Sequence, residues 1–259
     1  AYIDQETEQP VEPTSPDFSG FVFKIQANMD KNHRDRIAFV RICSGKFERG
    51  MEAFHVQGGK KLKLATGTSM MADDRAIVDE AYAGDIVGLF DPGIFNIGDT
   101  VCAGKTRVRY PAIPTFAPEI FARITQVNTM KRKQFVKGME ELAQEGAIQI
   151  FREPGFGMES VIVGVVGVLQ LEVLEQRLKS EYGVEVRRQP LPYSDIRWIM
   201  NDPDTINIPA LNVTRDTLRV EDMRGKNLLL FTSPWNVNWA VERNPDLILS
   251  EVGNLAFEK

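Results

Sequence analysis

Residues that could cradle a phosphate stand at Gly104-Lys105-Thr106. A phosphate-binding loop has the spacing G-x-x-x-x-G-K-[ST], because successive backbone N–H groups must wrap the phosphates while the lysine neutralises them. The position five before Gly104 is Asp99, and Gly98 misses the spacing by one residue. The D-x-x-G run at 85–88 lies in an alternating strand pattern, and no Asn-Lys-x-Asp run is present to bind guanine. The sequence therefore predicts that this chain alone binds no nucleotide.

Other titratable residues do not form a catalytic pattern. His33 stands close to Asp35 and could act as a general base, but no nucleophile stands at a recognisable spacing. The acidic pairs Asp73-Asp74 and Asp79-Glu80 are more typical of solvated loops beside a strand than of paired-carboxylate catalysis. His33 and His55 are too few and too isolated for a zinc site. We expect no catalytic residue, no bound cofactor and no metal in this chain.

Composition indicates a piece of a soluble cytoplasmic protein. With 259 residues, 43% apolar residues and a net charge of −5, the chain is long enough for about two domains. It has no apolar run near the roughly 20 residues that a membrane span requires. Cys43 and Cys102 lie in apolar strand-like settings and are predicted to be buried free thiols. Residues 1–17 hold five acids, no base and three prolines, which predicts a linker from a missing domain.

A β-barrel domain is predicted for residues 18–110. This part consists of short alternating runs bounded by Gly, Asp and Pro, at the spacing of a small barrel. The predicted strands are 20–27, 35–44, 52–56, 61–64, 76–81, 86–90 and 100–103. The stiff connector Tyr110-Pro111-Ala112-Ile113-Pro114 ends the domain.

An α+β domain is predicted for residues 111–259. Its elements follow the order β-α-β-β-α-β, which is the split pattern of ferredoxin-like folds. They are predicted at 119–126, 130–145, 147–152, 160–166, 168–182 and 184–188. A C-terminal extension with a strand at 227–232, a helix at 235–242 and a strand at 247–250 is expected to join the same domain.

Charge is unevenly distributed along this acidic chain. Residues 24–63 carry ten bases against four acids, and residues 105–137 carry eight against one. Residues 64–99 carry one base against seven acids. Concentrated basic segments can bind a polyanion at one face, although ordinary solvated faces are as common an explanation.

The helix predicted to begin near Met130 has its charges in an unfavourable order. Lys131, Arg132, Lys133 and Lys137 occupy its first half, whereas acids occupy its end. The helix dipole favours the reverse arrangement by roughly 0.3–1 kcal/mol per charge. Bases at a helix start strengthen an anion-attracting end, so we predict phosphate contact there. The full set of predicted contact residues, for such a polyanion or for another domain, is His33, Arg34, Arg36, Lys46, Arg49, Lys131, Arg132, Lys133, Lys137 and Phe156.

The run HRDRIAF at 33–39 resembles the opening hairpin of the second domain of ribosome-dependent translational GTPases, and its spelling is most similar to that of the release factor 3 family. Further similar stretches are 82–88, 96–100, 113–119, 145–147, 164–171 and 178–182. Elongation factor G shares the barrel hairpin and the YxGDI element, whereas the second domain and its Trp-bearing tail are more similar to the release factor. Residues 202–224 match least well.

The resemblance implies a role in translation termination. It implies the second and third domains of a GTP-driven factor that promotes departure of stop-codon-reading release factors from the ribosome. GTP or GDP with Mg²⁺ would then bind a missing N-terminal domain, and the parent would be a ribosome-stimulated GTPase. The implied partners are small-subunit RNA and protein, the missing GTPase domain and, indirectly, the stop-codon-reading factors, with no membrane and a monomeric chain.

Three alternatives remain open at this point. One is the corresponding part of an elongation factor G-like GTPase. Another is a stand-alone RNA-binding module, which would rely on exposed aromatic residues for base stacking. The third is a small-molecule enzyme with its site between domains, which would require several convergent titratable groups.

Overall fold

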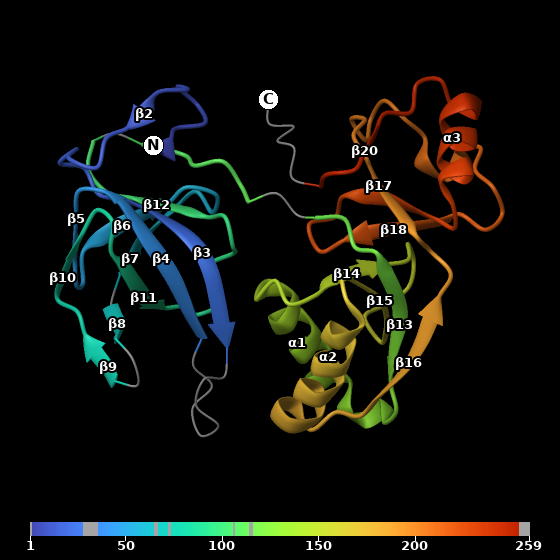
Figure 1. The fold of residues 1–259 in the computed structure, drawn as a ribbon, viewed down its shortest axis with the longest axis horizontal. Coiled ribbons are helices and arrows are strands. Elements are labelled where there is room, and N and C mark those ends of the chain that lie inside the picture. Colours follow the sequence, from blue (N-terminus) through green and yellow to red (C-terminus); the bar gives the residue numbers. More distant parts are fainter. Residues whose placement is uncertain are drawn as a thin grey trace. The chain divides into compact units, whose positions relative to one another are not determined.

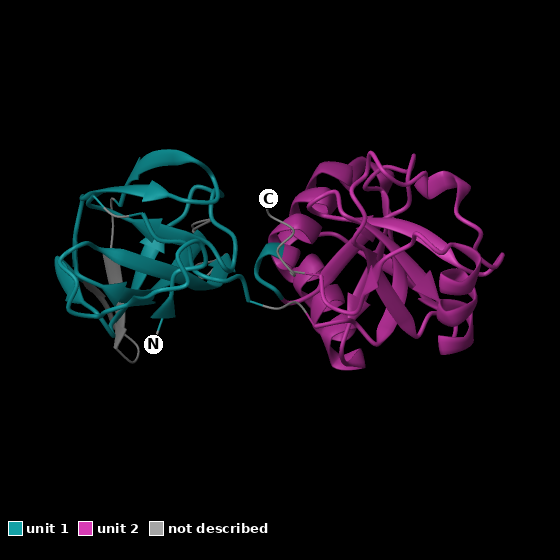
Figure 2. Ribbon diagram, turned by 90° about the horizontal axis from the view of Figure 1, so that it is seen from above, with its two compact units in different colours: residues 1–113, 144–146 teal, residues 114–143, 147–259 magenta. Residues whose placement is uncertain are grey.

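A computed structural model describes residues 2–27, 36–64, 67–71, 74–105, 107–113 and 116–253, with the backbone alone for 67–71 and 74–77. The chain forms two compact units (Figure 2). Unit 1 comprises residues 1–113 with 144–146, and unit 2 comprises residues 114–143 with 147–259.

Unit 1 contains a barrel-like antiparallel sheet of eight strands with the order β7-β6-β12-β3-β4-β11-β8-β9 (Figure 1). These strands are β3 (Ser19–Ala27), β4 (Arg36–Ser44), β6 (Glu52–His55), β7 (Lys60–Lys63), β8 (Gly67–Met71), β9 (Asp74–Ile77), β11 (Ile86–Phe90) and β12 (Thr100–Cys102). Short strands β5 (Lys46–Glu48) and β10 (Glu80–Tyr82) pair separately. One apolar core, which includes Val22, Val40, Phe47, Leu89 and Val101, is shared by both groups of strands.

The sequence-based strand assignments in unit 1 are largely confirmed. The strand predicted at 76–81 is instead divided between β9 and β10, and neither β5 nor β8 was predicted. Cys43 and Cys102 are buried and free, as expected. Burial raises the pKa of the Cys43 thiol to about 11, so this thiol stays protonated and weakly reactive.

The N-terminal segment differs from the linker predicted for residues 1–17. It forms the strands β1 (Tyr2–Ile3) and β2 (Pro10–Val11), which pair with each other. Asp4 is buried, and its carboxylate accepts hydrogen bonds from the Thr7 hydroxyl at 2.6 Å and from the Arg109 backbone at 2.7 Å. Composition could not reveal this order, because the segment is held by bonds to residues distant in sequence, such as Ser44 and Arg109.

Unit 2 is built on a second antiparallel sheet of eight strands with the order β16-β13-β15-β14-β18-β19-β17-β20. The strands are β13 (Ile120–Gln126), β14 (Gln149–Arg152), β15 (Ser160–Val165), β16 (Val186–Leu191), β17 (Asp195–Ile199), β18 (Leu218–Asp222), β19 (Asn227–Phe231) and β20 (Leu249–Ser250). The helices are α1 (Arg132–Gln144), α2 (Val168–Tyr182) and α3 (Pro234–Arg243), with short 3-10 turns at Thr129–Lys131 and Ile208–Ala210.

Helices α1 and α2 cover one face of the first four strands (Figure 1). Helical spacing places two sets of side chains on one face of each helix, and both sets pack there. Phe135, Met139, Leu142, Leu171, Leu174 and Leu178 are buried, and Tyr182 is partly buried. Gly183 ends α2 with φ +66°, the left-handed conformation that glycine adopts without strain. The opposite face of the sheet packs against residues of β17, β18 and β19, and α3 packs on a further cluster that contains Leu229 and Phe231.

The C-terminal extension continues the sheet instead of forming a separate layer. Strand β18 pairs with β14, and the remaining three strands follow it. Strands β17 and β18 were not predicted, because DIRWI and LRVED place polar and charged residues among their apolar ones. Of the helices in the described part of the chain, none is long and apolar enough to cross a membrane.

Candidate functional site

The start of α1 carries the densest group of predicted contact residues. Asn128 caps the preceding 3-10 turn, with its side-chain oxygen accepting from the backbone of Met130 at 2.9 Å. Phe135 is fully buried and anchors the helix, so the bases just before it face solvent. Lys131, Arg132 and Lys133 therefore form an exposed group at the beginning of a well-anchored helix.

Part of this group also has structural contacts. The Lys131 ammonium donates to the carbonyl of Gly183, where α2 ends and attracts positive charge. Arg132 forms an ion pair with Glu159 at 3.1 Å, and Lys137 forms one with Glu141 at 3.5 Å. The charge order in α1 is thus partly explained by neighbouring acids and by the end of α2, which sequence spacing within one helix could not reveal.

Lys133 differs from its neighbours. Its side chain is exposed, and no ion pair or hydrogen bond of that side chain is found within the described residues. A cation that the fold leaves unmatched at a helix start is suited to contact an external phosphate. Among the predicted residues of α1, Lys133 is therefore the strongest candidate for such a contact.

Phe156 lies in the loop between β14 and β15 and is 66% exposed. Its backbone N–H donates to Glu153 at 3.1 Å, and Gly155 before it has φ +82°. Glu159 in the same loop contacts Arg132, which ties the loop to the start of α1. The loop thus presents one large apolar side chain within the same unit as the basic group.

The remaining predicted contact residues belong to unit 1. Lys46 is held between Glu80 at 2.6 Å and Glu48 at 2.9 Å, and these carboxylates, Glu80 first, raise its pKa. Arg49 pairs with Asp79 at 3.3 Å on the exposed surface. Arg36 is buried and pairs with Asp91, so its guanidinium is a structural group of the barrel and not an exposed contact.

The two further predicted contacts, His33 and Arg34, lie outside the described residues. His55 is buried and hydrogen-bonds Asp99 at 2.7 Å, which places it in the core of unit 1.

The Gly104-Lys105 turn does not fit a phosphate. The Lys105 N–H donates to the carboxylate of Asp17 at 3.2 Å. A Cβ built on Gly104 would lie 2.2 Å from the same carboxylate. An anionic side chain thus occupies the position that a phosphate would need, and repulsion would exclude a second anion. Within the described residues, no group of His, Cys, Asp and Glu is arranged to hold a metal ion.

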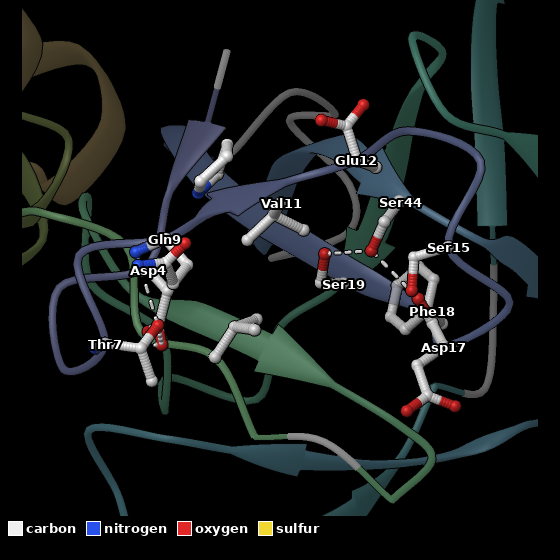
Figure 3. A pocket seen from close by; sticks show the side chains of 12 residues that line it. Asp4, Thr7, Gln9, Val11, Glu12, Ser15, Asp17, Phe18, Ser19 and Ser44 are labelled. Atoms are coloured by element: carbon white, nitrogen blue, oxygen red, sulfur yellow. Dashed lines mark hydrogen bonds between the residues drawn. The ribbon is translucent and has the colours of Figure 1, made fainter.

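A hollow of about 320 Å³ lies between the N-terminal segment, the beginning of β3 and the end of β4 (Figure 3). Ser19 and Ser44 line it, and their hydroxyls hydrogen-bond each other at 2.5 Å. Burial opposes ionisation of Asp4, but the Thr7 hydroxyl and backbone donors outweigh it and lower the pKa of Asp4. These polar groups are satisfied by internal hydrogen bonds, which makes the hollow a packing feature of the N-terminal segment.

An apolar surface at the beginning of α2 was not expected from the sequence. Val166, Val168, Leu169 and Val173 are 53%, 51%, 72% and 52% exposed, respectively. The signal was available, because Leu169 and Val173 are apolar although they fall off the face formed by Leu171, Leu174 and Leu178.

Two family models match the chain, one for each unit. The model described as "Elongation factor G domain 2" matches residues 17–104. The model described as "Class II release factor RF3, C-terminal domain" matches residues 110–242, which is more than half of the chain. The chain belongs to the class II release factor RF3 family. Its barrel-like unit is shared with elongation factor G, whereas unit 2 distinguishes the release factor family.

Curated relatives agree with this assignment. Peptide chain release factor 3 of Symbiobacterium thermophilum is 52% identical over 92% of this chain and 44% of its own length. The protein of the same name from Listeria monocytogenes is 46% identical over 96% of this chain and 46% of its own length. Peptide chain release factor 3 of Levilactobacillus brevis is 47% identical over 93% of this chain and 45% of its own length. The chain therefore spans a little under half the length of these relatives.

The likeness to a solved structure bears on the fold and not on the function. A Thermus thermophilus protein superposes with a TM-score of 0.56 at 19% identity, covering 71% of this chain and 28% of that one.

Proposed function

We propose that this chain forms the ribosome-binding and coupling part of a GTP-dependent release factor that acts in translation termination. The observation that carries the proposal is the match of unit 2 to the release factor model, together with identity of 45–52% to release factors over nearly the whole chain. In the parent protein, the chain promotes departure of a stop-codon-reading release factor. It acts in the cytoplasm as a monomer, with a barrel domain at 18–110, which the segment 1–17 precedes, and an α+β domain at 111–259.

The architecture suits docking and coupling. In this proposal, unit 1 is a translation-factor β barrel, and the strand order β16-β13-β15-β14 with two helices on one face is that of a ferredoxin-like domain with a C-terminal extension. GTP or GDP with Mg²⁺ binds elsewhere in the parent, because the Gly104-Lys105 turn is filled by Asp17. This chain supplies binding surfaces, and the nucleotide chemistry belongs to the parent.

The candidate RNA contact is the start of α1. Charge reversal at Lys131, Arg132 and Lys133 is expected to weaken binding of the chain to ribosomes and to flatten its dependence on salt, because fewer phosphate counterions are released. Co-sedimentation with ribosomes at several salt concentrations measures both effects. The matched control reverses Lys60, Lys61 and Lys63 of β7, all three of which are exposed. Equal loss in both variants would contradict a contact at α1.

The termination role is tested in a chimaera. This chain replaces the corresponding region of release factor 3 from Symbiobacterium thermophilum, to which it is 52% identical. The chimaera is expected to accelerate GTP-dependent dissociation of a labelled stop-codon-reading factor from ribosomes after peptide release. A folded, ribosome-binding chimaera that leaves dissociation at the rate without factor would defeat the proposed function.

A further inference from the structure

The beginning of unit 1 and the stretch that leads from it to unit 2 are bonded to each other. The first is residues 2–17, here called the strap, and the second is residues 109–113, here called the exit segment. The N–H of Gln5 donates to the carbonyl of Arg109 at 2.6 Å, and the N–H of Arg109 donates to the Asp4 carboxylate at 2.7 Å. Asp4 and Arg109 are 105 residues apart in sequence, so these bonds join two distant parts of the chain.

Asp4 anchors the strap. Among residues 2–17 it alone is buried, with 3% of its surface exposed. Besides the Arg109 N–H, its carboxylate accepts from the Thr7 hydroxyl at 2.6 Å and from the Thr7 N–H at 3.3 Å (Figure 3). The turn within the strap and the attachment to the exit segment thus share one acceptor. Loss of either would leave a buried carboxylate without part of its donors, which is unfavourable.

Tyr110 fastens the exit segment to the barrel. It is buried, its N–H donates to the Thr100 hydroxyl at 3.0 Å, and its own hydroxyl hydrogen-bonds that of Ser19 at 2.6 Å. Its ring packs edge-on against Phe21, with the ring centroids 6.2 Å apart. Tyr2 of the strap packs against the same ring, with the centroids 5.7 Å apart. Tyr110 therefore joins the strap to the barrel.

The thiol of Cys43 lies at this junction. On β4, Val40 and Ile42 belong to the core, so the alternation of a strand turns Cys43 to the outer face of the sheet. Cys43 is nevertheless fully buried, and its thiol interacts with the side chains of both Tyr110 and Tyr2. Its cover thus includes the exit segment and the strap. Access of a reagent to Cys43 would report whether both are in place.

The strap is built to leave without unfolding the barrel. None of residues 2–17 belongs to the apolar core of unit 1. Its two strands, β1 and β2, have two residues each and pair with each other. Glu8 has φ +56°, a left-handed conformation that is strained for a residue other than glycine. Few anchors and local strain are typical of elements that open independently of the rest of a domain.

We propose that the strap is a releasable clamp on the exit segment. When docked, it holds residues 109–113 in place and restricts the movement of unit 2 relative to unit 1. When released, it frees the exit segment and uncovers Cys43. Because the two segments stabilise each other, anything that binds or displaces the strap also changes the order of the exit segment, and the reverse holds equally.

The consequence of the clamp for coupling rests on the proposed function. If this chain couples parts of a larger release factor, a ligand or movement that acts on the strap sets the freedom of unit 2. The clamp itself depends only on contacts within unit 1, so it can be tested without ribosomes or nucleotide.

The first test measures the access of N-ethylmaleimide to Cys43 in the folded chain. Peptide mass spectrometry quantifies modification of Cys43 and Cys102 separately. Asp4→Ala is expected to accelerate modification of Cys43 about 10–100-fold, because loss of the charged acceptor favours the released strap. Cys102, which is buried on β12, should change by less than about threefold, because the barrel stays folded.

Glu12→Ala provides the matched control. It removes the same charge from an exposed position of the strap and should change the rate at Cys43 by less than about twofold. An unchanged rate at Cys43 in Asp4→Ala would overturn the inference. Equal acceleration of both thiols would also overturn it, because unit 1 would then open as a whole.

The second test asks whether the two segments stabilise each other. Asp4→Ala should speed hydrogen exchange of the Arg109 and Tyr110 amides about tenfold or more, with β3 and β4 unchanged. Tyr110→Phe removes only the hydroxyl that bonds Ser19, and it should speed exchange of the Gln5 amide about fivefold. An effect in one direction alone would show that the strap and the exit segment are independent, and it would overturn the clamp.

The third test measures the movement of unit 2. All three tryptophans lie in unit 2, so the decay of their fluorescence anisotropy reports its rotation. Asp4→Ala, but not Glu12→Ala, is expected to shorten the slow correlation time from that of the whole chain toward that of unit 2 alone. Equal correlation times in the two variants would contradict the restriction of unit 2 by the strap.

The chimaera with release factor 3 of Symbiobacterium thermophilum separates this inference from the proposed function. Asp4→Ala is expected to reduce its GTP-dependent acceleration of factor dissociation about threefold or more, with ribosome binding unchanged. An active chimaera that Asp4→Ala leaves unaffected would overturn control of unit 2 by the strap. Inactivity of the unmodified chimaera would instead defeat the proposed function, while thiol access and hydrogen exchange in the chain itself would still decide the clamp.

Discussion

Charged residues serve different purposes in the two units. In unit 1, Arg36 and Asp91 are buried together, with 10% and 0% of their side chains exposed, and the Asp91 carboxylate also accepts three backbone hydrogen bonds. In unit 2, Arg132 and Glu159 form an ion pair at the surface, with 61% and 51% of their side chains exposed. A buried charge that loses its partner is costly, whereas a solvated charge can be exchanged with little effect. Sequence counts of bases cannot separate these cases, but burial can.

The largest expected effect comes from removing the buried carboxylate of unit 1. Asp91→Ala leaves Arg36 buried without its ion-pair partner and removes the acceptor for the N–H groups of Gly93 and Ile94, so unit 1 should lose about 3–5 kcal/mol. Hydrogen exchange of β4 and β11 amides measures this loss locally. Tryptophan fluorescence would miss it, because all three tryptophans lie in unit 2.

The exposed pair Arg49–Asp79 of unit 1 provides the control. Its side chains are 46% and 78% exposed, so Asp79→Ala should cost at most about 1 kcal/mol. Similar losses in Asp79→Ala and Asp91→Ala would show that burial does not govern the contribution of charge in this unit.

The buried pair His55–Asp99 tests the same effect of burial, and here the carboxylate can be replaced by a neutral amide. Asp99→Ala removes the partner of His55 and the acceptor for the N–H of Asn96, at 2.7 and 2.8 Å. The first of these hydrogen bonds is buried and the second is partly buried, so their loss should destabilise unit 1 by roughly 2–3 kcal/mol. Denaturant unfolding followed by far-ultraviolet circular dichroism measures the change. Asp99→Asn keeps an acceptor and should recover at least half of it; no recovery would indicate that the negative charge itself is required.

These examples show what sequence patterns could and could not predict. Alternating apolar residues predicted β3, β4 and β11, and helical spacing placed Phe135, Met139 and Leu178 in the core, because burial on one face dictates such periods. Strand β18 escaped prediction because it is stabilised through pairing with β14 and β19, and β14 is distant in sequence.

The contact residues were predicted less well for a related reason. Arg36 and Lys131 are both bases in basic segments, yet Arg36 is buried beside Asp91 and Lys131 contacts the end of α2. Each partner is more than 50 residues away along the chain, so local charge counts could not distinguish a structural base from a free one. The partners become visible only when the chain is folded.

The exposed pair of unit 2 should contribute little to stability. Arg132→Ala removes an ion pair with Glu159 that is solvated on both sides, so we expect a loss of about 0.2–1 kcal/mol. Urea unfolding of unit 2, followed by tryptophan fluorescence, gives the value. Added salt should reduce it further. A loss comparable to that of Asp91→Ala would mean that the loop carrying Phe156 depends on this pair for its structure.

The smallest effect on stability, and the sharpest on binding, is expected at Lys133. Lys133→Gln and Gln134→Glu each make the start of α1 more negative by one charge, and both positions are exposed. Neither should change the free energy of unfolding by more than about 0.5 kcal/mol. If Lys133 contacts a phosphate, only Lys133→Gln lowers the slope of log affinity against log salt, by about one, because one fewer counterion is released. Equal slopes in the two variants would show that the ribosome responds to the overall charge of this end and not to a specific cation that the fold leaves unmatched.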